Sequence, residues 1–164
     1  MKILIDADSC PRDVRELVLR TAGRRGIPVI FAANRPIPGI DGTNAVMEIC
    51  PAADNAADDR IAELSEPGDL AVSRDLALAK RLLEKGAAVI NDRGRVFTRN
   101  NINELLSLRD FTVGLAENGM DFERTPGYGK KELKLFADSL DRQLAKLTAN
   151  SPPAAPRDTD SGSA

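Results

Sequence analysis

Acidic side chains stand at or near the ends of several apolar segments. Asp6 ends the first apolar run, and Asp8 follows it after one residue. The remaining acids of this kind are Asp54, Asp58, Asp59, Asp75 and Asp92. Carboxylates within a few ångströms repel one another, and a hard divalent cation removes that penalty. Mg²⁺ and Mn²⁺ prefer oxygen ligands, and near a phosphodiester they generate hydroxide and stabilise the leaving oxygen. The acids therefore predict a Mg²⁺ or Mn²⁺ site that hydrolyses phosphodiesters.

The residue types that are missing narrow the chemistry. The 164 residues include no His, which excludes His-based triads and imidazole metal ligands. The two cysteines, Cys10 and Cys50, are too few for a disulfide framework or a cysteine zinc site. Cys10 precedes Pro11 near the expected start of a helix, where it is either a reactive thiol or a small packing residue. The neighbouring acids and the lack of His favour packing.

Each acid also has a structural interpretation. Asp is a preferred N-cap, so Asp8, Asp75 and either Asp54 or Asp58 could each cap the helix that follows. Asp6 ends an apolar strand, where no cap is needed. Asp6 is therefore the strongest functional candidate.

Basic residues are concentrated in the first quarter of the chain, although the net charge is −2. Arg12 and Arg15 belong to the first helix, and Asn34 and Arg35 follow the second strand. Guanidinium groups at the edge that carries the acids could hold phosphates. We expect these four residues to bind nucleic acid, and a solvated helix face is the alternative.

Short apolar segments alternate with helical patterns along the chain. Strands are expected at 2–6, 27–33, 45–50, 69–73 and 87–91, with a small edge strand or turn at 95–98. Helices are expected from Pro11 to about Gly26, and at 56–65, 76–85, 101–118 and 130–147. The alternation predicts an α/β protein, a three-layer α/β/α fold with a mainly parallel sheet of about five strands. Ligands of such sheets bind outside the carboxyl ends of the strands, where these acids stand.

Residues 1–148 suit one domain of ordinary size. Residues 149–164 contain no large apolar side chain, so we expect a disordered tail. No apolar run approaches the roughly 18 residues that a membrane span needs. The N-terminal apolar run is too short, and too soon followed by acids, for a signal peptide. We therefore expect a cytoplasmic protein without a membrane partner.

The opening Asp6-Ala7-Asp8-Ser9-Cys10-Pro11 resembles the Asp-Ala-Asp-Ala-Cys-Pro start of the bacterial YaiI/YqxD family. Similar segments follow in order: Ala33-Asn34-Arg35-Pro36, Ala57-Asp58-Asp59-Arg60-Ile61, Glu66-Pro67-Gly68-Asp69-Leu70 and Asn91-x-Arg93-Gly94. The likeness covers about residues 1–147. Asp59 stands where the family commonly has Asn, and Asp92 where it commonly has Pro.

That family is regarded as PIN-domain-like, a fold of metal-dependent nucleases with acids at the carboxyl edge of a parallel sheet. The resemblance implies that Asp6, Asp58 and Asp75 ligate the metal and that Asp8 orients a ligand or water. Asp6, Asp8, Asp58 and Asp75 are thus the candidate catalytic residues. The expected activity is a Mg²⁺- or Mn²⁺-dependent nuclease acting on RNA or another nucleic acid.

Two alternatives remain open. A nuclease fold could hold RNA or a protein partner without cutting, with the basic first helix carrying the function. Asp6-x-Asp8 is also similar to the paired aspartates of haloacid-dehalogenase-type phosphatases, in which the first Asp is a nucleophile and the second a general acid. The continuation Ser9-Cys10-Pro11 departs from that signature.

Overall fold

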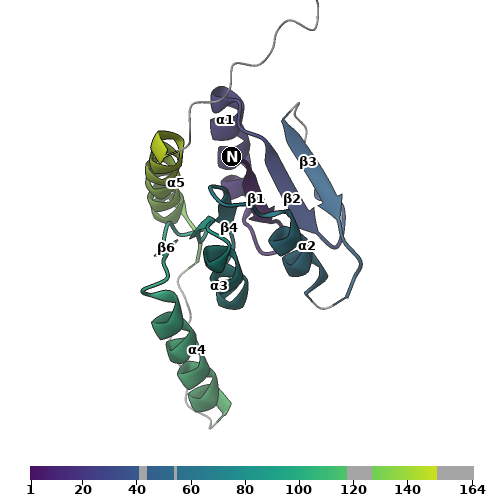
Figure 1. Cartoon of the computed structure of the whole chain (residues 1–164). Coiled ribbons are helices and arrows are strands. Elements are labelled where there is room, and N and C mark those ends of the chain that lie inside the picture. Colours follow the sequence, from purple (N-terminus) through teal and green to yellow (C-terminus); the bar gives the residue numbers. More distant parts are fainter. Residues whose placement is uncertain (41–43, 54, 118–126, 151–164) are drawn as a thin grey trace, which may run out of the picture.

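The computed structural model describes residues 1–40, 44–53, 55–117 and 127–150 (Figure 1). Its strands form one sheet: β1 (Ile3–Asp6), β2 (Val29–Ala33), β3 (Ala45–Ile49), β4 (Leu70–Val72), β5 (Ala88–Ile90) and β6 (Val96–Phe97). In the described part of the chain the strand order is β3-β2-β1-β4-β5-β6. Strands β1 to β5 are parallel and β6 is antiparallel to β5. The predicted mainly parallel sheet is confirmed, and the segment at 95–98 supplies a sixth strand.

Five helices complete the described part: α1 (Arg12–Arg25), α2 (Ala56–Leu64), α3 (Leu76–Glu84), α4 (Ile102–Glu117) and α5 (Lys130–Asn150). All lie close to their predicted positions. α5 continues to Asn150, beyond the expected domain boundary at 148. The rest of the expected tail, 151–164, lies outside the described residues. No described helix is long and apolar enough to cross a membrane.

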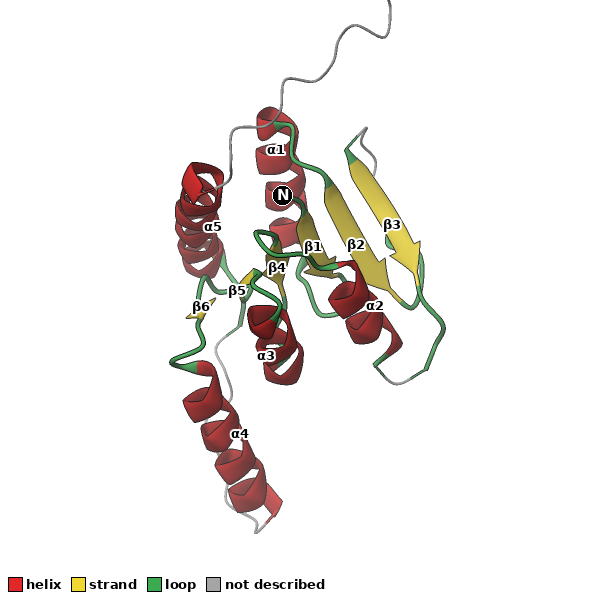
Figure 2. Ribbon diagram, viewed as in Figure 1, coloured by secondary structure: helices red, strands yellow, loops and turns green. Residues whose placement is uncertain are grey.

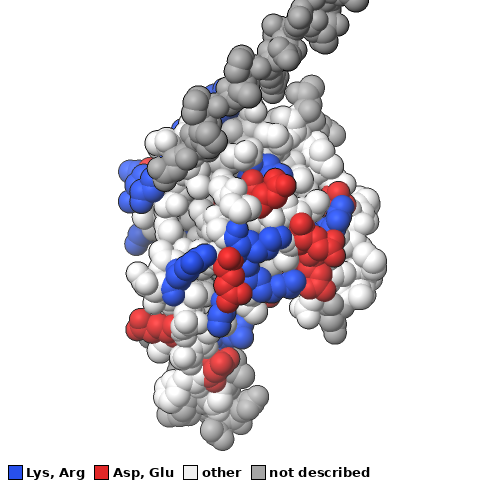
Figure 3. Space-filling model, viewed as in Figure 1, with Lys and Arg blue, Asp and Glu red and all other residues white. Residues whose placement is uncertain are grey.

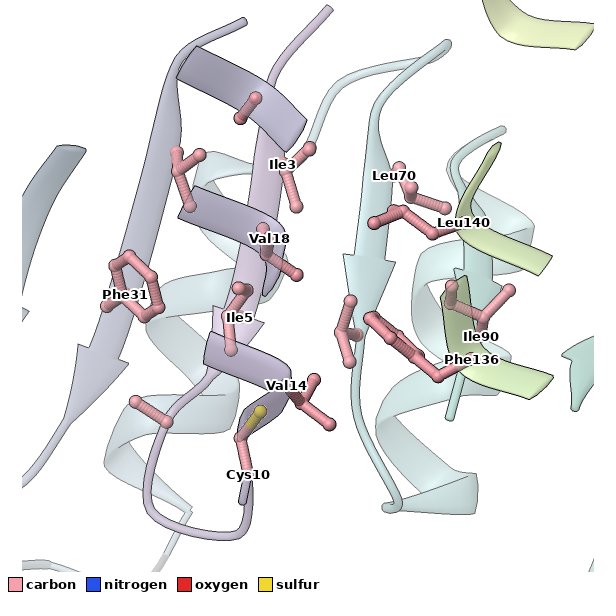
Figure 4. Packing of buried hydrophobic residues seen from close by; sticks show 14 of the residues in the cluster. Ile3, Ile5, Cys10, Val14, Val18, Phe31, Leu70, Ile90, Phe136 and Leu140 are labelled. Carbon is pink, nitrogen blue, oxygen red and sulfur yellow. The ribbon is translucent and has the colours of Figure 1, made fainter. Parts of the chain in front are cut away.

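Helices α1 and α5 cover one face of the sheet (Figure 2). Val14 and Val18 of α1 pack with Phe136 and Leu140 of α5 over the strands, and all four are fully buried (Figure 4). They recur at helical spacing, so each helix turns one apolar stripe toward the sheet. Burying each such side chain contributes roughly 1.5–3 kcal/mol.

The opposite face is covered by α2, α3 and the first turn of α4. Leu4, between two strand residues that face the first layer, points to this side because side chains alternate along a strand. It shares a core with Ile61 of α2, Leu78 of α3 and Ile102 of α4. The expected three-layer α/β/α architecture is therefore confirmed. Beyond its first turn α4 projects from the body (Figure 1), and Phe111 on it is 65% exposed.

The strand order brings the end of β1 to the middle of the sheet. β2 and β3 lie on one side of β1, and β4 and β5 lie on the other. Ile5 pairs with Val72, so Asp6, the last residue of β1, lies beside Ser73, the first residue after β4. In open parallel sheets, ligands bind at the carboxyl edge where the strand order reverses. Asp6 occupies that position.

Candidate metal centre

Asp6 is partly buried at the carboxyl end of the central strand. Its Oδ2 accepts hydrogen bonds from the hydroxyls of Ser9 (3.1 Å) and Ser73 (3.4 Å). Burial raises the pKa of the Asp6 carboxyl, and the charges of Asp8 and Asp75 act in the same direction, against the two hydroxyls. Among the described residues, Oδ1 of Asp6 has no hydrogen-bond donor, so that oxygen is available to a ligand.

Asp58 and Asp75 reach the same place from two helices. Asp58 lies in the first turn of α2, and Asp75 is the N-cap of α3, where its Oδ1 accepts a hydrogen bond of 3.0 Å from the Leu78 N–H. The pKa of Asp58 is raised to about 6, first by burial, then by the charges of Asp6 and Asp75 and by a hydrogen bond with the Asp75 carboxyl. The fold thus brings together three carboxyl groups that are far apart in the sequence.

The cap interpretation is right for Asp75 and wrong for two of the other acids. α1 begins after Pro11 without a side-chain cap, and Oδ2 of Asp8 instead accepts a hydrogen bond of 3.0 Å from the Asn34 backbone N–H. The N-cap of α2 is Asn55, and Asp58 lies inside the helix. Asp54, a further cap candidate, lies outside the described residues.

An open pocket of about 240 Å³ lies between these segments. Asp6, Asp8 and Asp58 line it together with Asn34. Within the described ranges, no three Asp, Glu or Cys side chains are arranged so that they could hold a metal ion. Burial and the charges of Asp6 and Asp75 favour the protonated form of Asp58, and a protonated carboxyl group is a poor metal ligand. The donors are all carboxylate oxygens, which suits Mg²⁺ or Mn²⁺ once that proton is lost.

The other two acids of the edge have different partners. Asp59 forms an ion pair of 2.9 Å with Arg81 and lines a different pocket. Asp92 is 2% exposed, and its Oδ2 accepts hydrogen bonds from Arg74 Nε (2.7 Å) and Nη2. Arg74 and Asp92 line a tight crevice together with Asp6, Ser9 and Ser73. Asp58, by contrast, lines the open pocket together with Asp6.

The four residues expected to bind nucleic acid are spread around this edge. Asn34 lines the acidic pocket, and Arg35 beside it is exposed. Arg15 Nη1 donates to the Cys10 carbonyl (3.0 Å), whereas the exposed Arg12 pairs with Glu16 (2.9 Å). On the face shown in Figure 3, basic and acidic side chains intermingle, and neither charge forms a continuous surface. The structure therefore brings Asn34 nearest to the acids.

Cys10 is a packing residue in this structure. It is 7% exposed and belongs to the core beneath α1 (Figure 4). Burial raises the pKa of its thiol to about 12, so the thiolate that a nucleophile needs is scarce at neutral pH.

Three side chains of the edge were not identified as site residues from the sequence: Ser9, Ser73 and Arg74. The signal available for two of them was the run Ser73-Arg74-Asp75 directly after an apolar strand. Ser9 follows Asp8, and its hydroxyl donates to the same Asp6 oxygen as the Ser73 hydroxyl. Small hydroxyl residues are common in loops, so only the contact with Asp6 distinguishes them.

The chain is similar to known proteins over nearly its whole length. The model of a family described as "Uncharacterized BCR, YaiI/YqxD family" matches residues 4–146. A UPF0178 protein of Treponema denticola is 50% identical over 146 residues, which cover 89% of this chain and 93% of the relative. A UPF0178 protein of Treponema pallidum is 46% identical, over 90% of this chain and 83% of the relative. One from Myxococcus xanthus is 39% identical, over 93% and 99%. No solved structure matches significantly.

Proposed function

The chain belongs to the YaiI/YqxD family, and from its acidic edge we propose that it is a divalent-metal-dependent nuclease of PIN-like type that hydrolyses phosphodiester bonds, with RNA as its substrate. One observation carries the proposal. Asp6, Asp58 and Asp75 come from three separate segments, and their mutual repulsion adds to burial in raising the pKa of Asp58 to about 6. Crowded carboxylates of this kind are characteristic of functional sites.

The proposed ligands are the carboxylates of Asp6, Asp58 and Asp75. A bound Mg²⁺ or Mn²⁺ would supply a hydroxide nucleophile at neutral pH and would stabilise the leaving oxygen. Ser9 and Ser73 fix one oxygen of Asp6, and the Leu78 N–H fixes one oxygen of Asp75. Such hydrogen bonds orient ligands before the metal arrives.

Asp8 has a supporting part in this proposal. The Asn34 N–H holds its Oδ2, and both residues line the open pocket beside Asp6 and Asp58. Asp8 would accept a hydrogen bond from water or from a sugar hydroxyl of the substrate. The pocket is open to solvent, so a polymer can reach Asp6, Asp8 and Asp58.

The test is cleavage of single-stranded RNA with Mn²⁺ by the wild-type protein and by Asp6→Asn and Asp75→Asn. Asn can accept the same hydrogen bonds and is a good N-cap, so both variants should fold. We expect each to lower the cleavage rate by roughly 10²-fold or more, because a metal-ligand bond is lost. The matched pair Asp58→Asn and Asp59→Asn should differ in the same assay. Asp58→Asn should lower the cleavage rate, and Asp59→Asn should cleave at close to the wild-type rate.

Full metal-dependent cleavage by both Asp6→Asn and Asp75→Asn would contradict the proposal. Tight RNA binding without metal and without turnover would favour a binding module instead. A phospho-aspartate or an aluminium fluoride adduct at Asp6 would favour a phosphatase.

A further inference from the structure

Arg74 lies beside the proposed metal site and has no part in the chemistry above. It follows β4 directly, between Ser73 and Asp75. Its Nε donates to Asp92 Oδ2 over 2.7 Å, and Nη2 donates to the same oxygen. The side chain of Arg74 is 50% exposed, whereas that of Asp92 is 3% exposed. One side of the guanidinium is therefore held by a buried carboxylate, and Nη1 has no hydrogen-bond acceptor among the described residues.

Asp92 is not fully satisfied in its buried position. Its Oδ1 is buried and has no hydrogen-bond partner within the described residues. An unsatisfied buried carboxylate oxygen costs free energy, and a buried ion pair is weak evidence for stability. The pair is therefore poorly explained by folding alone.

The backbone of Asp92 is nevertheless firmly placed. The Tyr128 hydroxyl donates to the Asp92 carbonyl over 2.8 Å, and the guanidinium of Arg93 lies 5.8 Å from the centre of the Tyr128 ring. Asp92 also follows β5 in the tight turn closed by the Gly94 N–H and the Asn91 carbonyl (3.1 Å). A buried acid fixed in this way sets the orientation of the guanidinium that it holds.

The position of Arg74 matters because of the charges around it. Arg74 and Asp92 line a tight crevice that Asp6 also lines, so Arg74 flanks the central acid. The acids Asp6, Asp8, Asp58 and Asp75 together exceed the charge of one divalent cation. A phosphodiester that approached them would still meet negative charge, and a fixed cation beside Asp6 offsets it. The planar fork of Arg suits phosphate oxygens better than the point charge of Lys.

We propose that Arg74 is the phosphate-binding residue of this site, contacting a non-bridging oxygen of the RNA backbone, and that Asp92 is a positioning residue that holds its guanidinium. This inference rests on the proposed function and names the residue that binds its substrate.

The test compares four variants with the wild type. Arg74→Gln removes the charge but leaves Asp92 buried and unpaired, which destabilises the fold. The double variant Arg74→Gln/Asp92→Asn removes both charges and so restores stability without restoring the cation. Arg74→Lys keeps the charge without the fork. Arg24→Gln is the matched control, since Arg24 is exposed in the last turn of α1, at the opposite edge of the sheet.

Three measurements are made on each protein: fluorescence anisotropy of a labelled single-stranded RNA at several salt concentrations without divalent ions, calorimetric Mn²⁺ affinity, and thermal unfolding. Arg74→Gln and the double variant should both bind RNA about tenfold more weakly, which is roughly 1.4 kcal/mol. For both variants, the slope of log affinity against log salt concentration should decrease in magnitude by about one, because one phosphate contact is lost. Arg74→Lys should be intermediate, Arg24→Gln unchanged, and Mn²⁺ affinity retained in all four.

Several outcomes would overturn the inference. If the wild type binds RNA and Mn²⁺ and the double variant binds RNA equally well, Arg74 is not the phosphate-binding residue, while the proposed function stands. RNA affinity that falls only in Arg74→Gln, and returns with thermal stability in the double variant, would show a structural role. A wild-type protein that binds neither Mn²⁺ nor RNA would refute the proposed function, and the inference with it.

Discussion

Asp58 links the electrostatics of the site to a pH dependence. Its pKa in the folded protein is about 6, above the ordinary 3.8, because of burial and the neighbouring acids. The folded protein without metal therefore holds this proton more tightly than the unfolded chain. That contribution to stability is complete below pH 3.8 and is lost as the pH rises through about 6.

Mn²⁺ needs the deprotonated carboxylate and competes with that proton. The rise in melting temperature caused by Mn²⁺ should therefore be larger above pH 6 than below it. Thermal unfolding with and without Mn²⁺ on both sides of this pH measures the effect. Asp58→Asn should abolish the pH dependence, and Asp59→Asn should retain it. An equal Mn²⁺ effect at both pH values in the wild type would contradict the role given to Asp58.

The pKa of Tyr128, which can be measured by absorbance, tests the contact between Tyr128 and Asp92. Tyr128 is the single tyrosine of the sequence, and burial together with the charge of Asp92 raises its pKa to about 12. The folded state keeps the phenol proton between pH 10 and 12, where the unfolded chain has lost it. This contribution to stability is present below pH 10 and is lost as the pH rises through 12.

We expect the ultraviolet absorbance of tyrosinate to appear near pH 12 in the native protein. In protein denatured by guanidinium it should appear near pH 10, the ordinary pKa of the group. Asp92→Asn should lower the native value, because it removes a nearby negative charge. A native titration at the ordinary pKa would show that Tyr128 does not contact Asp92 as described.

At the residue scale, the sequence was sufficient to bring Asp6, Asp58 and Asp75 under consideration. Asp6 ends a strand, Asp75 closely follows one, and Asp58 lies in the first turn of the helix after another. Parallel strands present their carboxyl ends at one edge. The sequence was not sufficient to assign the hydrogen-bond partner of each acid. Asp8 and Asp58 each precede or begin a helix as Asp75 does, yet only Asp75 caps one. Partner choice depends on distances between segments, which no local pattern contains.

The turn between β5 and β6 fixes Asp92 through its contact with α5. Gly94 has a φ of +86°, and a Cβ there would lie 2.4 Å from the Leu135 carbonyl oxygen of α5. The Ser139 hydroxyl also donates to the Gly94 carbonyl over 2.5 Å. The turn and the helix therefore pack backbone to backbone, and only glycine fits between them.

Gly94→Ala should lower the free energy of unfolding by roughly 2–4 kcal/mol, from the strained φ plus the clash with the helix backbone. Gly39→Ala is the matched control, since Gly39 has a φ of +82° but no heavy atom of a described residue within 4 Å of the added Cβ. It should cost only about 1–2 kcal/mol. Guanidinium unfolding of both variants measures the difference. Equal losses would show that the turn does not rest on α5.

At the element scale, periodicity located every described strand and helix to within a few residues. The β-branched and aliphatic runs of β1 and β2 and the apolar stripe of α5 are strong local signals. The segment at 95–98 was ambiguous, because β6 is only Val96–Phe97 and exists by pairing with β5. So short a strand has little pattern of its own.

The whole molecule makes a site from these parts through its strand order. Local pattern predicts parallel strands but does not say which are neighbours. The order β3-β2-β1-β4-β5-β6 places β1 at the reversal point, so that Asp6 meets Ser73 of the β4 end on one side and Asp58 of α2 on the other. A different order would have scattered the same acids. The central claim therefore concerns the assembled edge and is tested best by observing it directly.

That observation is the structure of a crystal soaked in Mn²⁺, analysed by anomalous scattering at the manganese edge. We predict a peak between Asp6, Asp58 and Asp75, with carboxylate oxygens at roughly 2.0–2.2 Å, the distance of small hard cations of this type. The hydrogen bond between Asp58 and Asp75 should be broken in that structure, because the cation replaces the proton of Asp58. A map at saturating Mn²⁺ that shows no peak there, with the Asp58–Asp75 hydrogen bond intact, would contradict the account.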